Sequence, residues 1–322
     1  MKYIFGPVPS RRLCRSLGVD LIPYKHCSFD CIYCQLGATV HKRAERQQFV
    51  ETGEVIAELE SALPCVEADY VTLSGSGEPT LCLGIGELIE GIKELTEIPV
   101  AVLTNSSLMS CAEVRKELLG ADLVIPSVDA ATQDVFERIN RPCSGLRIED
   151  ILCGLEEFSY EYSGKLWIEV MMVRDINDSD DEIDKIASAL TRIRCEKIQL
   201  NTVERPPAES FARALTQGAL EKARRRFDDR AELIVASGIY QDADGSFHSP
   251  AGAGLGAPGI EADCGRVLEL LKRRPCTVSD IAEGLDLNIN EAAKFVGILK
   301  GEGLICAIRR EGRAYFFAND GN

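Results

Sequence analysis

The sequence predicts an α/β fold built on a parallel sheet, followed by a small helix-turn-helix domain. Short apolar segments alternate with amphipathic segments from about residue 50 to residue 236. Regular alternation of strands and helices produces parallel strands joined by right-handed crossovers. A stretch rich in Gly and Pro then separates this region from a last group of helices. The periodicity fits both an open doubly wound sheet and a barrel.

The expected strands are short and mostly apolar, as is typical of strands that are buried on both faces. They occupy residues 70–75, 100–105, 123–129, 166–173, 197–203 and 232–236. The expected helices have apolar residues at helical spacing, so each can cover the sheet with one face. They occupy residues 54–63, 85–95, 112–119, 148–158, 181–193 and 215–227.

The C-terminal region has a pattern of its own. Residues 237–260 contain six glycines and two prolines, a composition typical of a linker. Helices are expected at 266–273, 278–284 and 290–300, and strands at 304–309 and 314–318. This order is that of a winged helix. We therefore expect a core at 1–236 with an N-terminal cap, a linker at 237–260 and a winged-helix domain at 261–322.

The charge of the chain limits its possible partners. The 322 residues include 36 Lys or Arg and 51 Asp or Glu, a net charge of −15, which argues against broad binding of nucleic acid through phosphate neutralisation. Residues 1–46 nevertheless contain eight basic residues and three acidic ones. That cluster indicates either a solvated surface or a site for an anionic ligand. The chain has neither a membrane-spanning apolar run nor a signal-peptide pattern, so a cytoplasmic location without a membrane partner is expected.

Three of the thirteen cysteines, Cys27, Cys31 and Cys34, form a C-x3-C-x2-C motif. Three nearby thiolates can bind three corners of a [4Fe–4S] cluster, which leaves one iron free for an external ligand. A zinc site with His26 or His41 as a further ligand is an alternative, as are three unrelated buried thiols. Most other cysteines are isolated in sequence and are interpreted as small buried apolar residues: Cys65, Cys82, Cys111, Cys143, Cys153 and Cys195.

The motif, with Tyr33 directly before the last cysteine, resembles the signature of the radical S-adenosylmethionine (radical SAM) superfamily. The resemblance implies a partial (β/α)6 TIM-like barrel and an oxygen-sensitive [4Fe–4S] cluster whose unique iron chelates SAM. It also implies reductive cleavage of SAM to a 5′-deoxyadenosyl radical that abstracts hydrogen from a substrate. The electron would come from a reductant such as flavodoxin or ferredoxin.

Other segments extend the resemblance. The segment from Ser74 to Pro79 is similar to the glycine-rich element of the superfamily that binds the SAM amino group, and polar residues also follow the next two strands. The cofactor-binding residues that the resemblance implies are Tyr33, Ser74, Gly75, Ser76, Gly77, Glu78, Asn105, Ser127 and Asp129. For the strand-end residues, capping of the loops is the alternative interpretation.

The segments around residues 5–12, 17–20 and 200–209 resemble one subfamily, the tRNA imidazoguanosine (wyosine) synthetase-like proteins. The resemblance implies substrate-side roles for Ser10, Arg11, Arg12, Asn201 and Arg205, although Arg11 and Arg12 fit a surface pair equally well. The chain departs from the tRNA-modifying enzymes in two ways. Only Cys14 lies upstream of the motif, so no second three-cysteine cluster is seen, and a winged-helix region is present.

The leading hypothesis is a radical SAM enzyme that acts on a modified nucleobase, tRNA or a related small anionic molecule. A second hypothesis is modification or activation of a protein or peptide that the winged helix docks. A third is a redox-sensing iron–sulfur regulator that binds DNA. Sequence-specific DNA binding is disfavoured, because the third helix of the C-terminal region contains only Lys294 and Lys300 as basic residues. We expect that region to dock or recognise a substrate.

Overall fold

The computed structural model describes residues 2–234, 240–241, 247–248, 260–285, 287, 289–310 and 312–319. Its centre is an eight-stranded sheet in the order β1-β2-β5-β6-β7-β8-β9-β10. Strand β1 runs antiparallel to β2, and every other neighbouring pair is parallel. The strands are β1 (Ile4–Ser10), β2 (Cys14–Val19), β5 (Tyr70–Leu73), β6 (Val100–Thr104), β7 (Leu123–Pro126), β8 (Lys165–Met172), β9 (Lys197–Thr202) and β10 (Ala231–Leu233).

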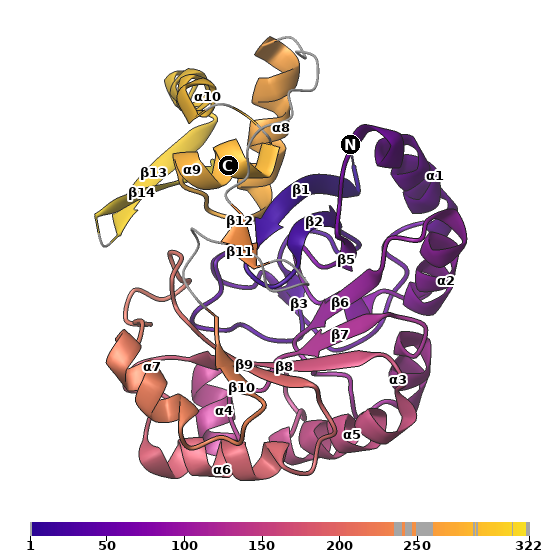
Figure 1. Ribbon diagram of the computed structural model, residues 1–322, viewed down its shortest axis with the longest axis vertical. Helices are drawn as coiled ribbons and strands as arrows, with labels where there is room; N and C mark the ends of the chain where they lie inside the picture. The colour runs from indigo at the N-terminus through magenta and orange to yellow at the C-terminus, as the bar shows by residue number, and fades with distance from the viewer. Residues whose placement is uncertain are drawn as a thin grey trace.

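Helices connect the parallel strands and cover the outer side of the curved sheet, where α1, α2, α3, α5 and α6 follow one another around its rim (Figure 1). Short 3-10 turns, η1 (Leu63–Cys65) and η2 (Pro79–Leu81), precede and follow β5. The helices are α1 (Thr52–Ala62), α2 (Ile85–Leu95), α3 (Ala112–Leu118), α4 (Gln133–Ile139), α5 (Ile148–Glu161), α6 (Asp180–Leu190) and α7 (Gln217–Arg224).

The apolar pattern explains this arrangement. On α2, the buried residues Ile85, Leu88, Ile89 and Ile92 lie on one helical face and join the main core cluster. All four residues of β7 are buried, as expected for a strand that is covered on both sides. The expected α/β fold with a mostly parallel sheet is confirmed, and the expected strands differ from the observed ones only at their ends.

Helix α4 was not predicted from the sequence, and neither was the β1–β2 hairpin, which adds an antiparallel edge to the parallel sheet. The two-residue strands at 26–27, 41–42, 240–241 and 247–248 were not predicted either. The turn of the β1–β2 hairpin inserts Leu13, which is 1% exposed, into a separate apolar cluster. The cluster also contains Ala101, Leu123, Ile125 and Trp167. One hairpin residue, Leu13, therefore packs in a cluster with residues of three strands, β6, β7 and β8.

The C-terminal unit consists of three helices and a two-stranded hairpin. Its elements are α8 (Ile260–Arg273), α9 (Val278–Leu285), α10 (Ile289–Gly301), β13 (Ile305–Arg310) and β14 (Arg313–Ala318). Its apolar cluster includes Phe5 and Val8 of β1, so the unit packs directly on the edge strand of the core, as Figure 1 shows. Of the expected linker at 237–260, the structure describes only β11 (Tyr240–Gln241), β12 (Phe247–His248) and the first residue of α8. No helix in the described part of the chain is both long enough and apolar enough to span a bilayer.

Candidate functional site

The three-cysteine motif lies on the long loop that follows β2. Within it, β3 (His26–Cys27) pairs with β4 (His41–Lys42), and the Cys34 N–H donates to the Cys31 carbonyl at 3.0 Å. Phe29 and Ile32, between the cysteines, are 3% and 0% exposed and belong to the main core. The three cysteines are each partly exposed. The core thus fixes the loop through its apolar residues.

Two asparagine amides donate hydrogen bonds to the cysteine sulfurs. Asn105 Nδ2 lies 3.4 Å from Cys27 Sγ, and Asn140 Nδ2 lies 3.4 Å from Cys31 Sγ. Asn105 directly follows β6, and Asn140 caps the end of α4, so two separate elements converge on the loop. Hydrogen bonds to cluster sulfurs are one of the means by which proteins set the reduction potential of an iron–sulfur cluster.

The electrostatics of the thiols fit a metal-binding role. Burial raises the pKa of Cys27 to about 12 and raises the pKa of Cys31 and of Cys34 above its usual range. Without a nearby positive charge, thiols in such a setting stay protonated at neutral pH. Bound iron would supply that charge and hold the sulfurs as thiolates.

The donor atoms near the motif bear on which metal it could bind. Within the described ranges, no three His, Cys, Asp or Glu side chains lie close enough together to hold one ion. The rings of His26 and His41 lie against each other, with centroids 4.1 Å apart. Thiolate is the ligand that iron–sulfur clusters use, so the donor chemistry of the three cysteines suits such a cluster.

Glu78 connects the glycine-rich loop after β5 to the end of β6. Its carboxylate is buried and accepts hydrogen bonds from Thr80 N at 3.1 Å, Thr80 Oγ1 at 2.6 Å, Thr104 Oγ1 at 2.6 Å and Asn105 N at 2.6 Å. Burial raises the pKa of Glu78, and these hydrogen bonds oppose that rise. Through the bond to its backbone, Glu78 positions Asn105 beside Cys27.

The glycines of this loop permit close packing against the cysteine loop. Gly75 has φ +143°, and a Cβ there would lie 2.4 Å from the Asp20 carboxyl carbon. A Cβ on Gly77 would lie 1.9 Å from the His26 carbonyl oxygen. Ser76 is held by its N–H and Oγ, which donate to the Asp20 carboxylate at 3.0 and 2.6 Å, while the Ser74 N–H donates to Val19. Only glycine fits at the two tight positions.

A second carboxylate, Asp129, joins the next strand end to the cysteine loop. Its Oδ1 accepts from Met171 N at 2.9 Å, and its Oδ2 accepts from Asn140 Nδ2 at 2.7 Å and from the Tyr33 hydroxyl. Burial raises the pKa of Asp129 to about 6. Nearby, the Ser127 carbonyl accepts from Ser106 Oγ at 2.7 Å. The predicted residues Tyr33 and Asp129 are therefore in direct contact.

The predicted substrate-side residues form a neighbouring ionic network. Arg12 Nη1 lies 2.8 Å from Glu169 Oε2, and Arg11 Nη1 lies 2.8 Å from Glu204 Oε2. Asn201 bridges the two pairs, because its Nδ2 donates to Glu169 at 2.9 Å and its Oδ1 accepts from Arg11 at 3.3 Å. The side chains of Arg11 and Arg12 are only 19% and 16% exposed, so the interpretation of these arginines as a surface pair is wrong.

The other two substrate-side candidates have different surroundings. Ser10 Oγ accepts from Arg12 N at 3.4 Å and Leu13 N at 3.2 Å, so Ser10 holds the hairpin turn. Arg205 Nη1 donates to Gln35 Oε1 at 2.9 Å, which ties the segment after β9 to the residue that follows Cys34. Burial lowers the pKa of Arg205 to about 10.

Four site residues were missed in the sequence: Asn140, Glu169, Glu204 and Gln35. Glu169 had a detectable signal, since it is the one acid in β8, a strand that is otherwise apolar after Lys165. Asn140 had none, because it follows a helix that the sequence did not predict. The interpretation of the isolated cysteines also needs correction: Cys82 is buried, but Cys65 and Cys153 are exposed.

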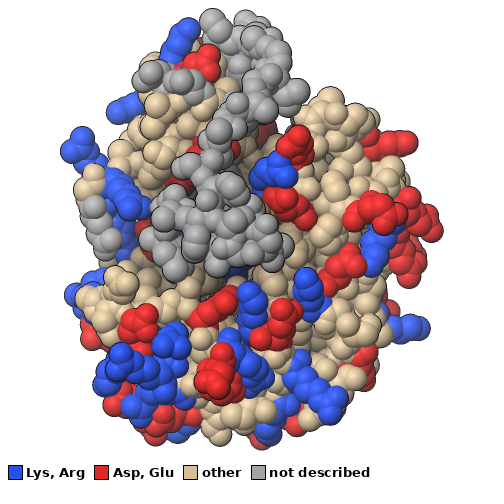
Figure 2. Space-filling model, in the orientation of Figure 1, with Lys and Arg blue, Asp and Glu red and all other residues tan. Residues whose placement is uncertain are grey.

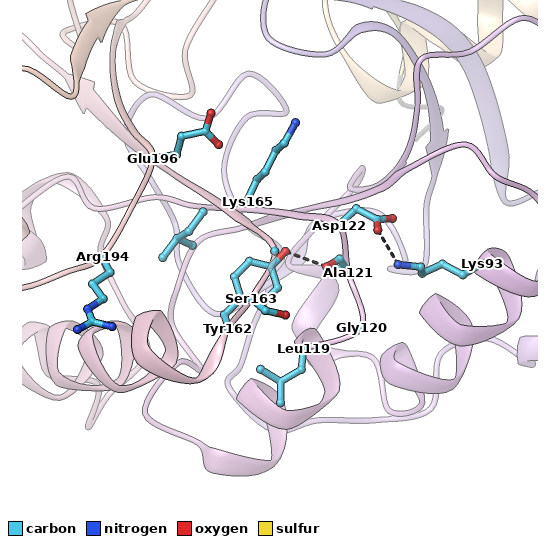
Figure 3. Close-up of a pocket in the computed structure, with 12 residues that line it drawn as sticks. Lys93, Leu119, Gly120, Ala121, Asp122, Tyr162, Ser163, Lys165, Arg194 and Glu196 are labelled. Atoms are coloured by element: carbon cyan, nitrogen blue, oxygen red, sulfur yellow. Dashed lines mark hydrogen bonds and ion pairs between the residues drawn. The ribbon is translucent and has the colours of Figure 1, made fainter.

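A pocket elsewhere in the fold is not part of this site. It has a volume of about 570 Å³ and lies at the amino ends of β7 and β8 (Figure 3). Its walls include the ion pair of Lys93 with Asp122 at 2.5 Å and the hydrogen bond of the Tyr162 hydroxyl to Ala121 O at 2.9 Å. None of the predicted site residues lines it.

Comparison with known proteins agrees with the fold and the thiol loop. Residues 21–187 match the radical SAM superfamily, and the chain belongs to this family. It is therefore a radical SAM enzyme, of a superfamily that uses a [4Fe–4S] cluster and SAM.

Relatives of the chain include UPF0026 proteins. One from Helicobacter pylori (strain ATCC 700392 / 26695) is 34% identical over 291 residues, with 88% of each chain covered. One from Synechocystis sp. is 41% identical over 204 residues, covering 63% of this chain and 76% of the relative.

Two further proteins are similar to this chain over a smaller share of their own length. A protein named GTPase Obg from Brachyspira hyodysenteriae is 41% identical over 235 residues, which are 73% of this chain but only 35% of that protein. The chain thus spans about a third of that relative's length. A radical SAM methyltransferase from Sphaerobacter thermophilus superposes with a TM-score of 0.51 at 16% identity, covering 68% of this chain and 65% of the other. That likeness concerns the fold alone.

Proposed function

We propose that Cys27, Cys31 and Cys34 bind three irons of the [4Fe–4S] cluster and leave the fourth iron to SAM. The observation that carries this proposal is the pair of asparagine amides that donate to Cys27 and Cys31. The Asn140 amide also donates to Asp129, while Asn105 is held through its backbone N–H, which donates to Glu78. When bound, the cluster supplies the electron that cleaves SAM.

In this proposal the strand-end residues bind and orient SAM. The sheet with its outer helices forms the partial (β/α)6 barrel, and the carboxyl ends of its strands are where sites form in such folds. We assign Ser74, Gly75, Ser76 and Gly77 of the loop after β5 to SAM, together with Ser127 and Asp129 after β7 and Tyr33 on the cysteine loop. Glu78 acts mainly by holding Asn105, since its carboxylate already accepts four hydrogen bonds.

We infer a small anionic substrate, such as a modified nucleobase or a related molecule, rather than a long nucleic acid. Arg11 and Arg12 pair with Glu204 and Glu169, whereas the neighbouring Arg205 donates to the neutral Gln35, and its charge favours a compact negative group. On the face drawn in Figure 2, Lys and Arg alternate with Asp and Glu. Such a mixed surface does not favour binding along a phosphate backbone. The resemblance to the wyosine synthetase-like subfamily contributes only the substrate class, a modified nucleobase, to this proposal.

The C-terminal unit has the element order of a winged helix, and we propose that it recognises the substrate. Its contact with the core gives it a position next to the substrate-side network. A protein or peptide substrate is the second candidate, supported by the exposed apolar residues Ile289, Leu304 and Ile308 on this unit, which are 53%, 41% and 46% exposed. Retention of tRNA that falls steeply with added salt would favour tRNA over both candidates.

The test is anaerobic reconstitution followed by incubation with dithionite and SAM. The wild-type chain should release 5′-deoxyadenosine, measured by liquid chromatography and mass spectrometry. Cys31→Ala should lose both the cluster and this product, whereas the exposed control Cys65→Ala should keep both. A full cluster in Cys31→Ala would contradict the ligand assignment. A wild-type chain with a cluster but no nucleoside product would favour the redox-sensing regulator.

A further inference from the structure

The contact between the core and the C-terminal unit is built from specific hydrogen bonds. Arg310 on β13 donates through Nη1 to the Arg205 carbonyl at 2.9 Å and through Nη2 to the Ala212 carbonyl at 3.2 Å. The Tyr315 hydroxyl on β14 donates to the Glu204 carbonyl at 3.2 Å. The C-terminal hairpin therefore holds the backbone of the segment that carries Glu204 and Arg205.

Arg274 brings an unsatisfied guanidinium to this contact. It directly follows α8, and its backbone N–H donates to the Leu270 carbonyl at 3.2 Å. Its Nε and Nη2 atoms are buried, and among the residues that the structure describes they have no hydrogen-bond acceptor. Buried donors are nearly always satisfied, and a charged one that is left unpaired is strongly unfavourable. The position of Arg274 thus indicates that an acceptor is missing.

Arg205 has a similar need for negative charge. Its guanidinium has a neutral partner, Gln35. After burial, the charge of Arg274 is the next largest cause that lowers the pKa of Arg205, while Cys276 and Asp280 act in the opposite direction. The Asp280 carboxylate is already engaged with Thr277 N and Oγ1 at 2.8 and 2.9 Å.

The nearby acids are also occupied. Glu204 pairs with Arg11 and Glu169 with Arg12. Arg274 lies two residues before Cys276, whose backbone pairs with that of Phe316. Phe316 is next to the Tyr315 that contacts Glu204, so Arg274 lies at the hairpin that holds Arg205. In the described part of the contact, neither arginine pairs with a carboxylate. Guanidinium groups bind phosphate and carboxylate oxygens through paired N–H donors, and they do so most strongly where water is excluded.

We propose that Arg205 and Arg274 together bind an oxyanion group of the substrate, a phosphate or a carboxylate, so that the C-terminal unit completes the substrate site. This inference rests on the proposed function, because it assigns the anionic part of that substrate. Gln35 directly follows Cys34, so an anion on Arg205 lies beside the proposed cluster loop. Arg274 is a binding residue here, and the C-terminal unit is a part of the active enzyme.

The experiment compares thermal unfolding of the anaerobic, reconstituted full chain in sodium phosphate, sodium acetate and sodium chloride at equal ionic strength. At an anion concentration about 100-fold above its dissociation constant, the wild-type midpoint should rise by roughly 5–10 °C relative to chloride. Arg274→Met should lose most of that rise, and so should Arg205→Met. Arg309→Met removes an exposed charge from the same hairpin and should keep the full rise.

The melting midpoints of the variant and the wild type in sodium chloride alone provide a second readout. Since Arg274→Met replaces a cation whose Nε and Nη2 are buried without an acceptor by an apolar side chain of similar length, it should melt at or above the wild-type temperature. A structural role for Arg274 would instead lower the midpoint by several degrees, and that result would overturn the proposal. So would an equal phosphate rise in Arg274→Met and wild type, or no rise above chloride with either anion.

A rise with phosphate alone assigns a phosphate group, and a rise with acetate alone assigns a carboxylate; both support the site. The melting assay involves no cleavage of SAM. If the wild-type protein shows no anion effect but still forms 5′-deoxyadenosine, this site is rejected and the proposed enzyme function stands. If the wild-type protein shows the anion effect but forms no 5′-deoxyadenosine, the proposed function is rejected and the anion site stands.

Discussion

Replacing Glu78 by glutamine tests whether one buried carboxylate holds the glycine-rich loop and Asn105 in place. The carboxylate accepts four hydrogen bonds, three at Oε1 and one at Oε2. A glutamine amide offers one acceptor oxygen and one donor nitrogen. In either orientation its NH2 group faces donors, either the Asn105 N–H at 2.6 Å or the group formed by Thr80 and Thr104.

The expected loss follows from these contacts. One hydrogen bond to a charged group, worth about 1.5–3 kcal/mol, is lost, and a buried N–H is left opposite another donor, for about 1–3 kcal/mol more. Relaxation of the Thr hydroxyls recovers part of this, so the free energy of unfolding should fall by about 2–4 kcal/mol. For a core of this size that corresponds to a midpoint lower by roughly 5–15 °C.

The assay is thermal unfolding followed by circular dichroism, together with the visible absorbance of the reconstituted cluster. Glu90→Gln is the matched control, since Glu90 is exposed on α2, and it should melt with the wild type. Glu78→Gln should also reconstitute a smaller amount of cluster, because Asn105 is no longer fixed beside Cys27. A variant that melts within a degree of wild type and binds a full cluster would refute the reasoning.

Three further predictions concern the hairpin, the glycine-rich loop and the ionic network. Leu13→Ala should lower the free energy of unfolding in urea by about 2–5 kcal/mol, because Leu13 is 1% exposed, whereas Leu119→Ala, at a surface position 38% exposed, should lower it by much less. Gly77→Ala should yield little folded, cluster-binding protein, since its Cβ would lie 1.9 Å from the His26 oxygen; normal recovery on a gel-filtration column would contradict that contact. Burial raises the pKa of Glu169, but the charge of Arg12, the hydrogen bonds from Asn201 and Arg12 and the charge of Arg11 together outweigh it and leave the pKa below its usual value. The stability that this carboxylate contributes is therefore present above its unfolded-state pKa and is lost as the pH falls through the lower folded-state pKa. Glu169→Gln should destabilise the protein at pH 7 and much less in strong acid; equal losses at both pH values in chemical denaturation would contradict the pairing.

The periodic parts of the fold could be predicted because the apolar pattern of the local sequence shows which of their residues are buried. Strands β6 and β9 and helix α2 each carry an apolar pattern that fits only one kind of element. Helix α4 was missed, although α3, which is equally short, was predicted. The β1–β2 hairpin was missed because residues such as Leu13 are buried by strands far away in sequence.

In the site too, features that depend on neighbouring residues could be predicted, whereas contacts between residues distant in sequence could not. Cys27, Cys31 and Cys34 are recognisable from spacing alone, and so is the glycine-rich loop. The partners of these groups were not predictable, since Asn140 lies 109 residues from Cys31 and Asn105 lies 78 residues from Cys27. The pairing of Arg12 with Glu169 likewise depends on how the hairpin packs against β8.

The contact between Arg205 and the C-terminal unit depends on the tertiary structure as well. The sequence indicated that this unit recognises a partner, but it gave no indication that Arg274 would be buried without an acceptor. That feature arises only when the hairpin of β13 and β14 is placed against the segment after β9.

Mössbauer spectroscopy of the 57Fe-reconstituted protein, with and without SAM, tests the central claim most directly. We expect a [4Fe–4S] signal in which one iron site changes when SAM is added, because three irons are bound by Cys27, Cys31 and Cys34 and one is not. The same cluster should be absent from Cys31→Ala. A protein that binds only zinc, or a cluster whose four irons are all unchanged by SAM, would contradict the account.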